Sequence, residues 1–223
     1  MPRAQKIHPK GGVIMVKTAV LVSGGGTNLQ AVMDAHLFGE IPNCELTAVI
    51  SSDPEAYALI RAKSANIPAF VVDRTLFPNA VSYNTALMQK LQDLDIELIV
   101  LAGYAYDLSG AILRAFDGQI INTFPSLLPA FAECSGMTLA PYEAAIRAGV
   151  KLSGATAYFV RESGMPIILQ QAVEVWEGDT PKTLQRRIME EAEWKLLPKA
   201  VALYCQGGLQ TDGDVVHILG GDK

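Results

Sequence analysis

The chain has 223 residues, half of them hydrophobic, which is enough for one domain with a sizeable core. Its formal net charge of −5 argues against non-specific nucleic-acid binding, because that requires a basic surface. The three cysteines lack metal-ligand spacing, which favours reduced thiols and no bound metal. No apolar run reaches the roughly 18–20 residues that cross a bilayer, so we expect a cytoplasmic protein with no membrane contact.

Residues 1–15 are predicted to be a disordered N-terminal extension. The segment carries basic residues but lacks the apolar stretch of a signal peptide. From residue 16 to residue 223 no linker, repeat or low-complexity tract interrupts the pattern. We therefore expect a single domain over 16–223.

Strands and helices alternate through the first half of the chain. Strands are short apolar runs bounded by glycine, proline or asparagine, and helices show apolar residues at a spacing of three and four. Because the strands are apolar on both faces, they indicate a parallel sheet covered by helices on both sides. The expected strands cover 18–22, 46–50, 69–72 and 98–101, and the expected helices cover 28–37, 55–65 and 81–94.

The pattern changes after a further short strand at 119–121. Two consecutive strands follow and are expected to pair as a hairpin-like unit, and a long helix begins after Asp179 and Thr180 with Pro181 in its first turn. The fold class is therefore α/β: an open, mostly parallel, doubly wound sheet with antiparallel strands near the C-terminus. The later segments are strands at 155–160, 167–175 and 215–219 and a helix at 180–204.

A glycine-rich loop follows the first strand and opens the first helix. Glycine tolerates positive φ and lets a ligand approach the backbone amides, and the helix N-terminus adds free N–H groups with partial positive charge. The loop matches neither the dinucleotide pattern nor a Walker A, so it favours a monophosphate, although a plain strand-to-helix turn is the alternative. The expected phosphate-binding residues are Gly25, Gly26, Thr27 and Asn28.

Six segments, spread from about residue 15 to residue 218, form a further pattern. They read VLVSGGGTNLQ at 20–30, LIVLAG at 98–103, NTFPSLLP at 122–129, GAT at 154–156, PIILQ at 166–170 and EEAEWK at 190–195. Together and in this order they resemble the glycinamide ribonucleotide formyltransferases. That resemblance implies the formyltransferase fold, and a reaction of purine synthesis in which 10-formyltetrahydrofolate gives its formyl group to the amine of glycinamide ribonucleotide.

The resemblance assigns the substrate side to residues that are intact here. The substrate phosphate is expected on Gly26, Thr27 and Asn28, and Glu193 matches a carboxylate that holds the ribose hydroxyls. The implied partner is a phosphorylated small molecule, a phosphoribosyl compound. We expect no tightly bound cofactor, and a monomer or a homodimer.

The catalytic side is altered. The family uses an Asn to hold the formyl oxygen, a His to stabilise the developing charge, and an Asp to orient the His. The Asn is present as Asn122, whereas Phe124 stands at the His position and Ser163 at the Asp position, with Glu162 as a nearby carboxylate. A phenylalanine side chain can neither donate a hydrogen bond nor transfer a proton.

Two further family histidines are replaced, one by Tyr142 and one by Tyr158. The loop at 161–166 is about two residues shorter than that of the family, so folate is expected to bind weakly. The resemblance places the folate contacts on Tyr104, Ala105, Tyr106, Leu108, Arg161 and Glu162.

Three functional hypotheses follow. The first is an active formyltransferase with a variant site, and the second is a phosphoribosyl-binding homologue that has lost formyl transfer or catalyses another reaction. The third, a dinucleotide-binding dehydrogenase, is disfavoured because Ser51 and Ser52 end the second strand where an acidic residue is required, with Asp53 the only acid nearby. The side chains favour a member of the formyltransferase family whose formyl transfer is weak or lost.

Overall fold

A computed structural model describes residues 15–134 and 136–220. The extension predicted over 1–15 lies outside the described residues except for Met15, which is exposed. The first half of the chain forms β1 (Val16–Val22), α1 (Thr27–Leu37), β2 (Cys44–Ser51), α2 (Tyr57–Ser64), β3 (Ala69–Val71), a 3₁₀ turn (Arg74–Leu76), α3 (Ala80–Asp93) and β4 (Leu98–Leu101).

The second half begins with a short helix and ends with a hairpin. It forms α4 (Gly110–Ala115), β5 (Ile120–Phe124), α5 (Ala140–Ala148), β6 (Leu152–Phe159), β7 (Ile167–Glu174), α6 (Pro181–Ile188), a π-helical segment (Met189–Glu193), α7 (Trp194–Cys205), β8 (Leu209–Asp212) and β9 (Val215–Ile218). Among the described residues, no helix combines the length and the apolar character that crossing a membrane requires.

The strands form one sheet in the order β3-β2-β1-β4-β5-β6-β7-β9-β8. β3, β2, β1, β4 and β5 are parallel, β6 is antiparallel to both β5 and β7, and β8 and β9 form an antiparallel hairpin at the edge. The predicted fold class is thereby confirmed. The parallel order brings the carboxyl ends of β1, β4 and β5 to the same edge of the sheet.

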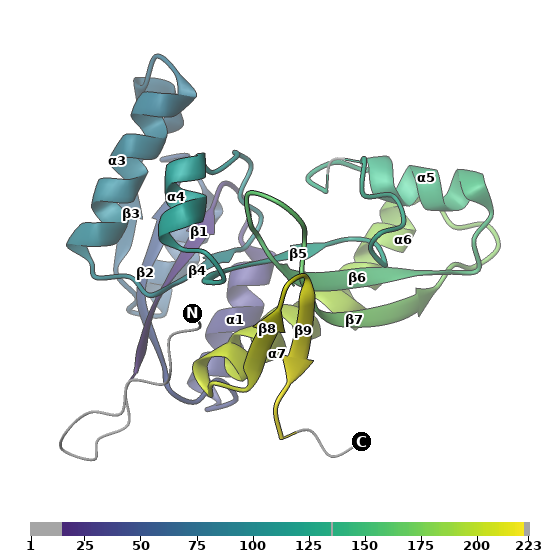
Figure 1. Ribbon diagram of the computed structural model, residues 1–223. Coiled ribbons are helices and arrows are strands. Elements are labelled where there is room, and N and C mark those ends of the chain that lie inside the picture. The colour runs from purple at the N-terminus through teal and green to yellow at the C-terminus, as the bar shows by residue number, and fades with distance from the viewer. Residues whose placement is uncertain (1–14, 135, 221–223) are drawn as a thin grey trace.

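Helices cover both faces of the sheet, as Figure 1 shows. In β1, Val20 and Val22 pack into a core with α1, α2 and α7, while Ala19 and Leu21 pack into a second core with α3 and α4. All four β1 side chains are fully buried. A strand buried on both faces has no polar side to alternate with, which is why it is a continuous apolar run in the sequence.

The structure differs from the sequence-based expectation in two respects, three further elements and one interrupted helix. The helices α4 and α5 and the strand β8 were not predicted; α4 has six residues, fewer than two turns, so it shows no helical periodicity. The helix expected over 180–204 is present, but it is interrupted by the π-helical segment between α6 and α7. A single wide turn adds one residue without changing the apolar composition, so the sequence pattern conceals it.

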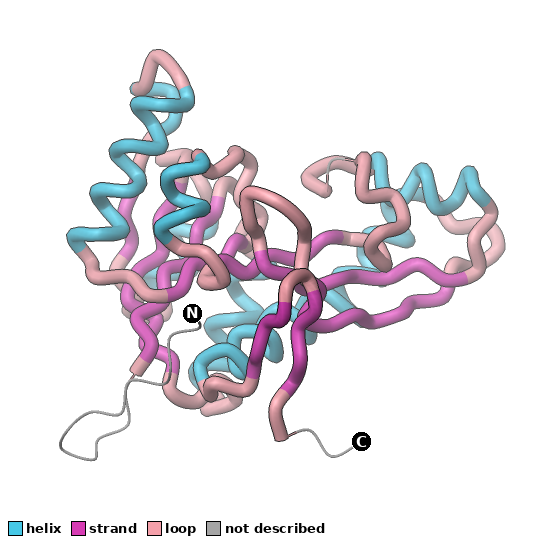
Figure 2. The backbone as a smooth tube through the Cα atoms, viewed as in Figure 1, coloured by secondary structure: helices cyan, strands magenta, loops and turns pink. Residues whose placement is uncertain are grey.

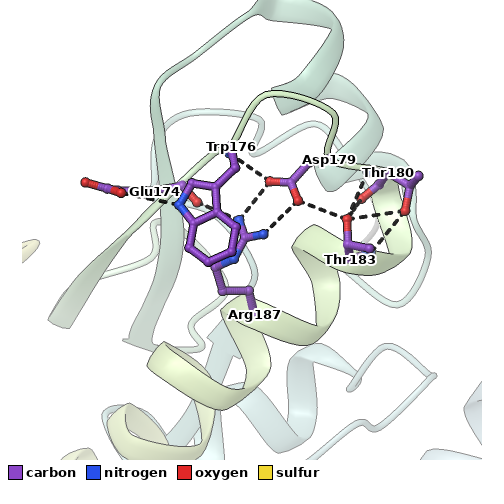
Figure 3. Close-up of polar contacts among 6 residues, drawn as sticks. All are labelled: Glu174, Trp176, Asp179, Thr180, Thr183 and Arg187. Atoms are coloured by element: carbon purple, nitrogen blue, oxygen red, sulfur yellow. Dashed lines mark hydrogen bonds and ion pairs between the residues drawn. The ribbon is translucent and has the colours of Figure 1, made fainter.

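The start of α6 is fixed by a compact polar network (Figure 3). Thr180 is the N-cap and forms a reciprocal capping box with Thr183, which confirms the predicted helix start. Arg187 donates to both carboxylate oxygens of Asp179 at 2.7 Å and lies 3.5 Å from the centroid of the Trp176 ring. These hydrogen bonds from Arg187 lower the pKa of Asp179 to about 2, so the ion pair persists at all but strongly acidic pH.

Candidate functional site

A cavity of about 460 Å³ opens at the carboxyl ends of β1, β4 and β5. Its floor is the glycine loop, and its walls come from β5, β6, α5, α6 and the π-helical segment. This position agrees with the rule that open α/β sheets bind ligands beyond the carboxyl ends of their strands. The lining includes residues 23–28, 102–105 and 122–124 together with Gly136, Met137, Tyr142, Tyr158, Gln185, Met189 and Glu193.

The glycine loop is held from behind by α2. Arg61 donates from Nε to the Gly25 carbonyl at 2.8 Å, and the Ala58 amide donates to the Gly24 carbonyl at 3.0 Å. Gly26 is the N-cap of α1 with φ of 71°, and a Cβ at this position would lie 2.7 Å from the Ala58 Cβ. The sequence therefore needs glycine here for both its conformation and its space. The result is a rigid loop at the N-terminus of α1, on the floor of the cavity.

Ser23 joins the loop to the end of β4. Its amide donates to the Gly103 carbonyl at 3.1 Å, and its hydroxyl accepts from the Ala105 amide at 2.9 Å. The same hydroxyl lies 2.7 Å from that of Ser52. These bonds bring Ala105 and its neighbour Tyr104 to the cavity wall.

Glu193 is the one carboxylate among the residues that line the cavity in the described part of the chain. It comes from the π-helical segment, is 7% exposed, and accepts a hydrogen bond from the Thr123 hydroxyl at 3.4 Å. Burial raises its pKa to about 7, against the opposing effect of hydrogen bonds from Thr123 and Asn28. The Asn28 Oδ1 is buried and has no partner among the described residues. The Asn28 side chain, which lies beside Glu193, therefore has an acceptor left for a ligand hydroxyl.

The raised pKa of Glu193 predicts a pH-dependent stability. The folded state holds this proton between about pH 4.5 and pH 7 while the unfolded state has released it, so the free energy of unfolding falls as pH rises through that window. Glu193→Gln should remove this slope. Between pH 5 and pH 8 we expect the variant to gain roughly 2 to 3 kcal/mol relative to wild type, measured by urea unfolding.

A matched control is available on the same helix. Glu191 is exposed, so Glu191→Gln should leave the pH dependence of stability as it is in wild type. Equal pH slopes for wild type and Glu193→Gln would show that the buried carboxyl titrates at its ordinary pKa.

Asn122 and Tyr158 form the wall that faces the glycine loop. They are paired across β5 and β6, and the Asn122 Nδ2 donates to the Tyr158 hydroxyl at 3.0 Å. The Asn122 Oδ1 accepts from the Thr123 amide at 2.9 Å. Phe124 is 8% exposed and packs with Leu128 and Tyr158, so an apolar ring stands beside this polar pair.

Most of the site residues predicted from the sequence meet in this cavity. The phosphate-side residues, the catalytic Asn position and the His position all line it, as do two of the folate-side residues: Gly25, Gly26, Thr27, Asn28, Glu193, Asn122, Phe124, Tyr104 and Ala105. The other folate-side residues and the Asp position do not line it, namely Tyr106, Leu108, Arg161, Glu162 and Ser163.

The connection between β6 and β7 carries Ser163, the predicted Asp position, away from the cavity. It rises beside α4 and the β8–β9 hairpin, as Figure 2 shows. Arg161 pairs with Asp117 at 3.2 Å and donates to the Gly213 carbonyl at 3.1 Å, and Glu162 pairs with Arg114. Ser163 therefore lines a separate depression between α4 and the β8–β9 turn, together with Arg161 and Glu162.

Tyr106 belongs to an aromatic cluster behind the cavity wall. Its ring lies 5.9 Å from that of Tyr83 and 6.1 Å from that of Tyr104, and Arg74 lies 5.8 Å from its centroid. The Tyr83 and Tyr104 hydroxyls are hydrogen-bonded to each other. Through this cluster α3 supports the wall that Tyr104 presents to the cavity.

The sequence did not single out every lining residue. Gln185 and Met189 project into the cavity from successive turns at the junction of α6 and the π-helical segment, and Thr123 holds Glu193. The spacing of four between Gln185 and Met189 is the signal that the sequence carries. It does not single these residues out, because residues of these types carry no reactive group that would distinguish them from an ordinary helix face.

Comparison with known proteins agrees with this geometry. Residues 16–201 match the family model described as formyl transferase. Phosphoribosylglycinamide formyltransferase of Haemophilus influenzae is 38% identical over 208 residues, which cover 92% of this chain and 95% of that protein. The Bacillus subtilis protein of the same name is 36% identical, covering 84% and 93%. The crystal structure of glycinamide ribonucleotide transformylase 1 from Symbiobacterium toebii has a TM-score of 0.84 at 41% identity, covering 92% and 94%.

Proposed function

The chain belongs to the phosphoribosylglycinamide formyltransferase family of purine biosynthesis, and from this we propose that it binds glycinamide ribonucleotide, or a closely related phosphoribosyl compound, but transfers formyl groups to it only weakly. One observation carries the proposal. The intact phosphate loop and Glu193 open into the same cavity as Phe124, which occupies the position of the family's histidine.

The substrate side of the cavity suits a phosphoribosyl group. The loop at Gly26 offers a helix N-terminus to the phosphate, and Glu193 with the unpartnered Asn28 Oδ1 offers acceptors to ribose hydroxyls. The pKa of Glu193 near 7 means that the carboxyl is largely protonated in the empty cavity below neutral pH. Ligand hydroxyls that donate to it favour its ionised form.

The catalytic side lacks two groups that the family chemistry uses. Phe124 cannot act as an oxyanion donor, and Ser163 and Glu162 lie in the separate depression beside α4. Loss of one oxyanion donor typically lowers a rate by about 10²–10³, and loss of a general base by about 10²–10⁴. Asn122 remains, so we expect slow transfer and not complete inactivity.

The implied cosubstrate, 10-formyltetrahydrofolate, fits the described residues only in part. Tyr104 and Ala105 line the cavity and would contact it, whereas Tyr106 and the connection at 161–166 are engaged elsewhere. With fewer residues around it, the folate should bind more weakly than the phosphoribosyl substrate.

Calorimetric titration tests the proposed substrate side. Glycinamide ribonucleotide should bind at least about a hundredfold more tightly than the dephosphorylated glycinamide riboside, because the riboside leaves the loop amides without an anion. Equal affinity for the two compounds would contradict the phosphate assignment. Tight binding combined with no transfer at all would favour the non-catalytic homologue.

A further inference from the structure

A second hydrogen-bond donor stands next to Asn122 on the cavity wall. The orientation of the Asn122 amide is fixed by Thr123, whose backbone N–H can only donate and therefore bonds to Oδ1. The amide nitrogen must then face Tyr158, to which it donates one hydrogen at 3.0 Å. Its second hydrogen has no acceptor among the described residues.

The Tyr158 hydroxyl also has a hydrogen that is free for a ligand. Its oxygen accepts from Asn122, and no described residue accepts its own hydrogen. Burial raises the pKa of this phenol, so it stays protonated across the physiological range. Phe124 and Leu128 pack around the ring and hold it in place. Asn122 and Tyr158 thus carry two unsatisfied hydrogens side by side at a cavity wall.

We propose that the Tyr158 hydroxyl and the second N–H of Asn122 form a donor pair that stabilises the oxyanion of a formyl group reacting in this cavity. The proposal rests on the proposed function, because it identifies the groups that sustain the weak transfer expected there. Tyr158 would act as a catalytic residue through its O–H.

The step balances without loss of the phenol proton. The amine nitrogen of the acceptor forms a bond to the formyl carbon, and the π pair of the carbonyl moves to its oxygen, where the two donors stabilise it. When the carbonyl re-forms, the bond breaks between the formyl carbon and the nitrogen of the cosubstrate that carried the formyl group. That nitrogen leaves with the electron pair and takes up the proton that the amine loses.

Tyr158→Phe isolates the hydroxyl, because it keeps the buried ring. Measured in single turnover with enzyme in excess, the rate of formyl transfer to glycinamide ribonucleotide should fall by about 10²–10³. The dissociation constant for the ribonucleotide should stay within about twofold of wild type. Tyr158→His, which restores an N–H donor, should retain a clearly higher rate than Tyr158→Phe. A merely structural role for the hydroxyl would not produce this rescue.

Tyr204→Phe is the matched control. Tyr204 is half-buried and its ring lies 6.2 Å from that of Phe159, but it does not line the cavity. Its transfer rate should match that of wild type, and thermal unfolding checks that all variants fold. Equal rates for wild type and Tyr158→Phe, or no transfer by wild type in single turnover, would overturn the donor pair. If the ribonucleotide still binds, the proposed binding of a phosphoribosyl compound survives either result; if the ribonucleotide does not bind, the proposed function itself is wrong.

Discussion

Phe124→His is expected to leave formyl transfer within about tenfold of the slow wild-type rate, although it restores the side chain that the family uses. An imidazole in this catalytic role needs an orienting carboxylate. Among the described residues that line the cavity the one carboxylate is Glu193, which Thr123 holds, while Phe124 packs with Leu128 and Tyr158. Steady-state kinetics with glycinamide ribonucleotide and a 10-formyl folate measure the effect.

One substitution is not expected to restore the carboxylate that the family resemblance assigns to position 163. Position 163 lies in the depression beside α4. In the same connection, Arg161 forms an ion pair with Asp117 and Glu162 forms one with Arg114. Phe124→His combined with Ser163→Asp and two residues inserted in this connection should exceed the product of the separate effects, because cooperating catalytic groups are not additive.

The kinetic experiment has a clear contrary result. A wild-type rate as high as that of the bacterial relatives, with tight folate binding, would show that the cavity catalyses the reaction without the histidine. Full activity of Phe124→His alone would show that the imidazole needs no carboxylate here.

Gly26→Val should abolish phosphate-dependent binding. The left-handed conformation at φ of 71° disfavours a β-branched residue, and its Cβ would meet Ala58 at 2.7 Å. The loop must move away from α2, so its amides no longer converge on the anion. We expect the affinity for glycinamide ribonucleotide to fall by about 10² or more, measured by calorimetry.

Gly39→Val separates backbone strain from loss of the site. Gly39 follows the other end of α1 and has φ of 75°, but a Cβ there would meet no atom within 4 Å. This variant should lose about 1–2 kcal/mol of stability and keep its affinity for the ribonucleotide. Unchanged affinity in Gly26→Val would place the phosphate elsewhere.

The sequence predicted the glycine loop that forms the floor of the cavity, because that loop depends on local features. Three glycines between a strand and a helix specify the loop, and parallel strand order brings its neighbours together. The place of Asn122 at the cavity could be predicted from the position of β5 in the sequence alone. Glycine at position 26 is required by a conformation and by one close neighbour, Ala58, on the following helix.

The folate side could not be predicted from the same kind of pattern. Residues 161–166 lie away from the cavity, and Arg161 and Glu162 form ion pairs there with Asp117 and Arg114, more than forty positions earlier in the chain. Charged residues in a loop show no periodicity that would indicate their partners. The pairing of Asn122 with Tyr158 likewise depends on the register of two antiparallel strands.

The π-helical segment at Met189–Glu193 bears on how this fold changes over evolutionary time. A π turn contains one residue more than the α-helical turn it replaces, so loss of a single codon within it restores a regular helix. Loss of the Glu193 codon itself would remove the carboxylate, while the apolar faces of α6 and α7 keep their packing. A lineage could therefore discard the Glu193 carboxylate and keep the fold in one genetic step.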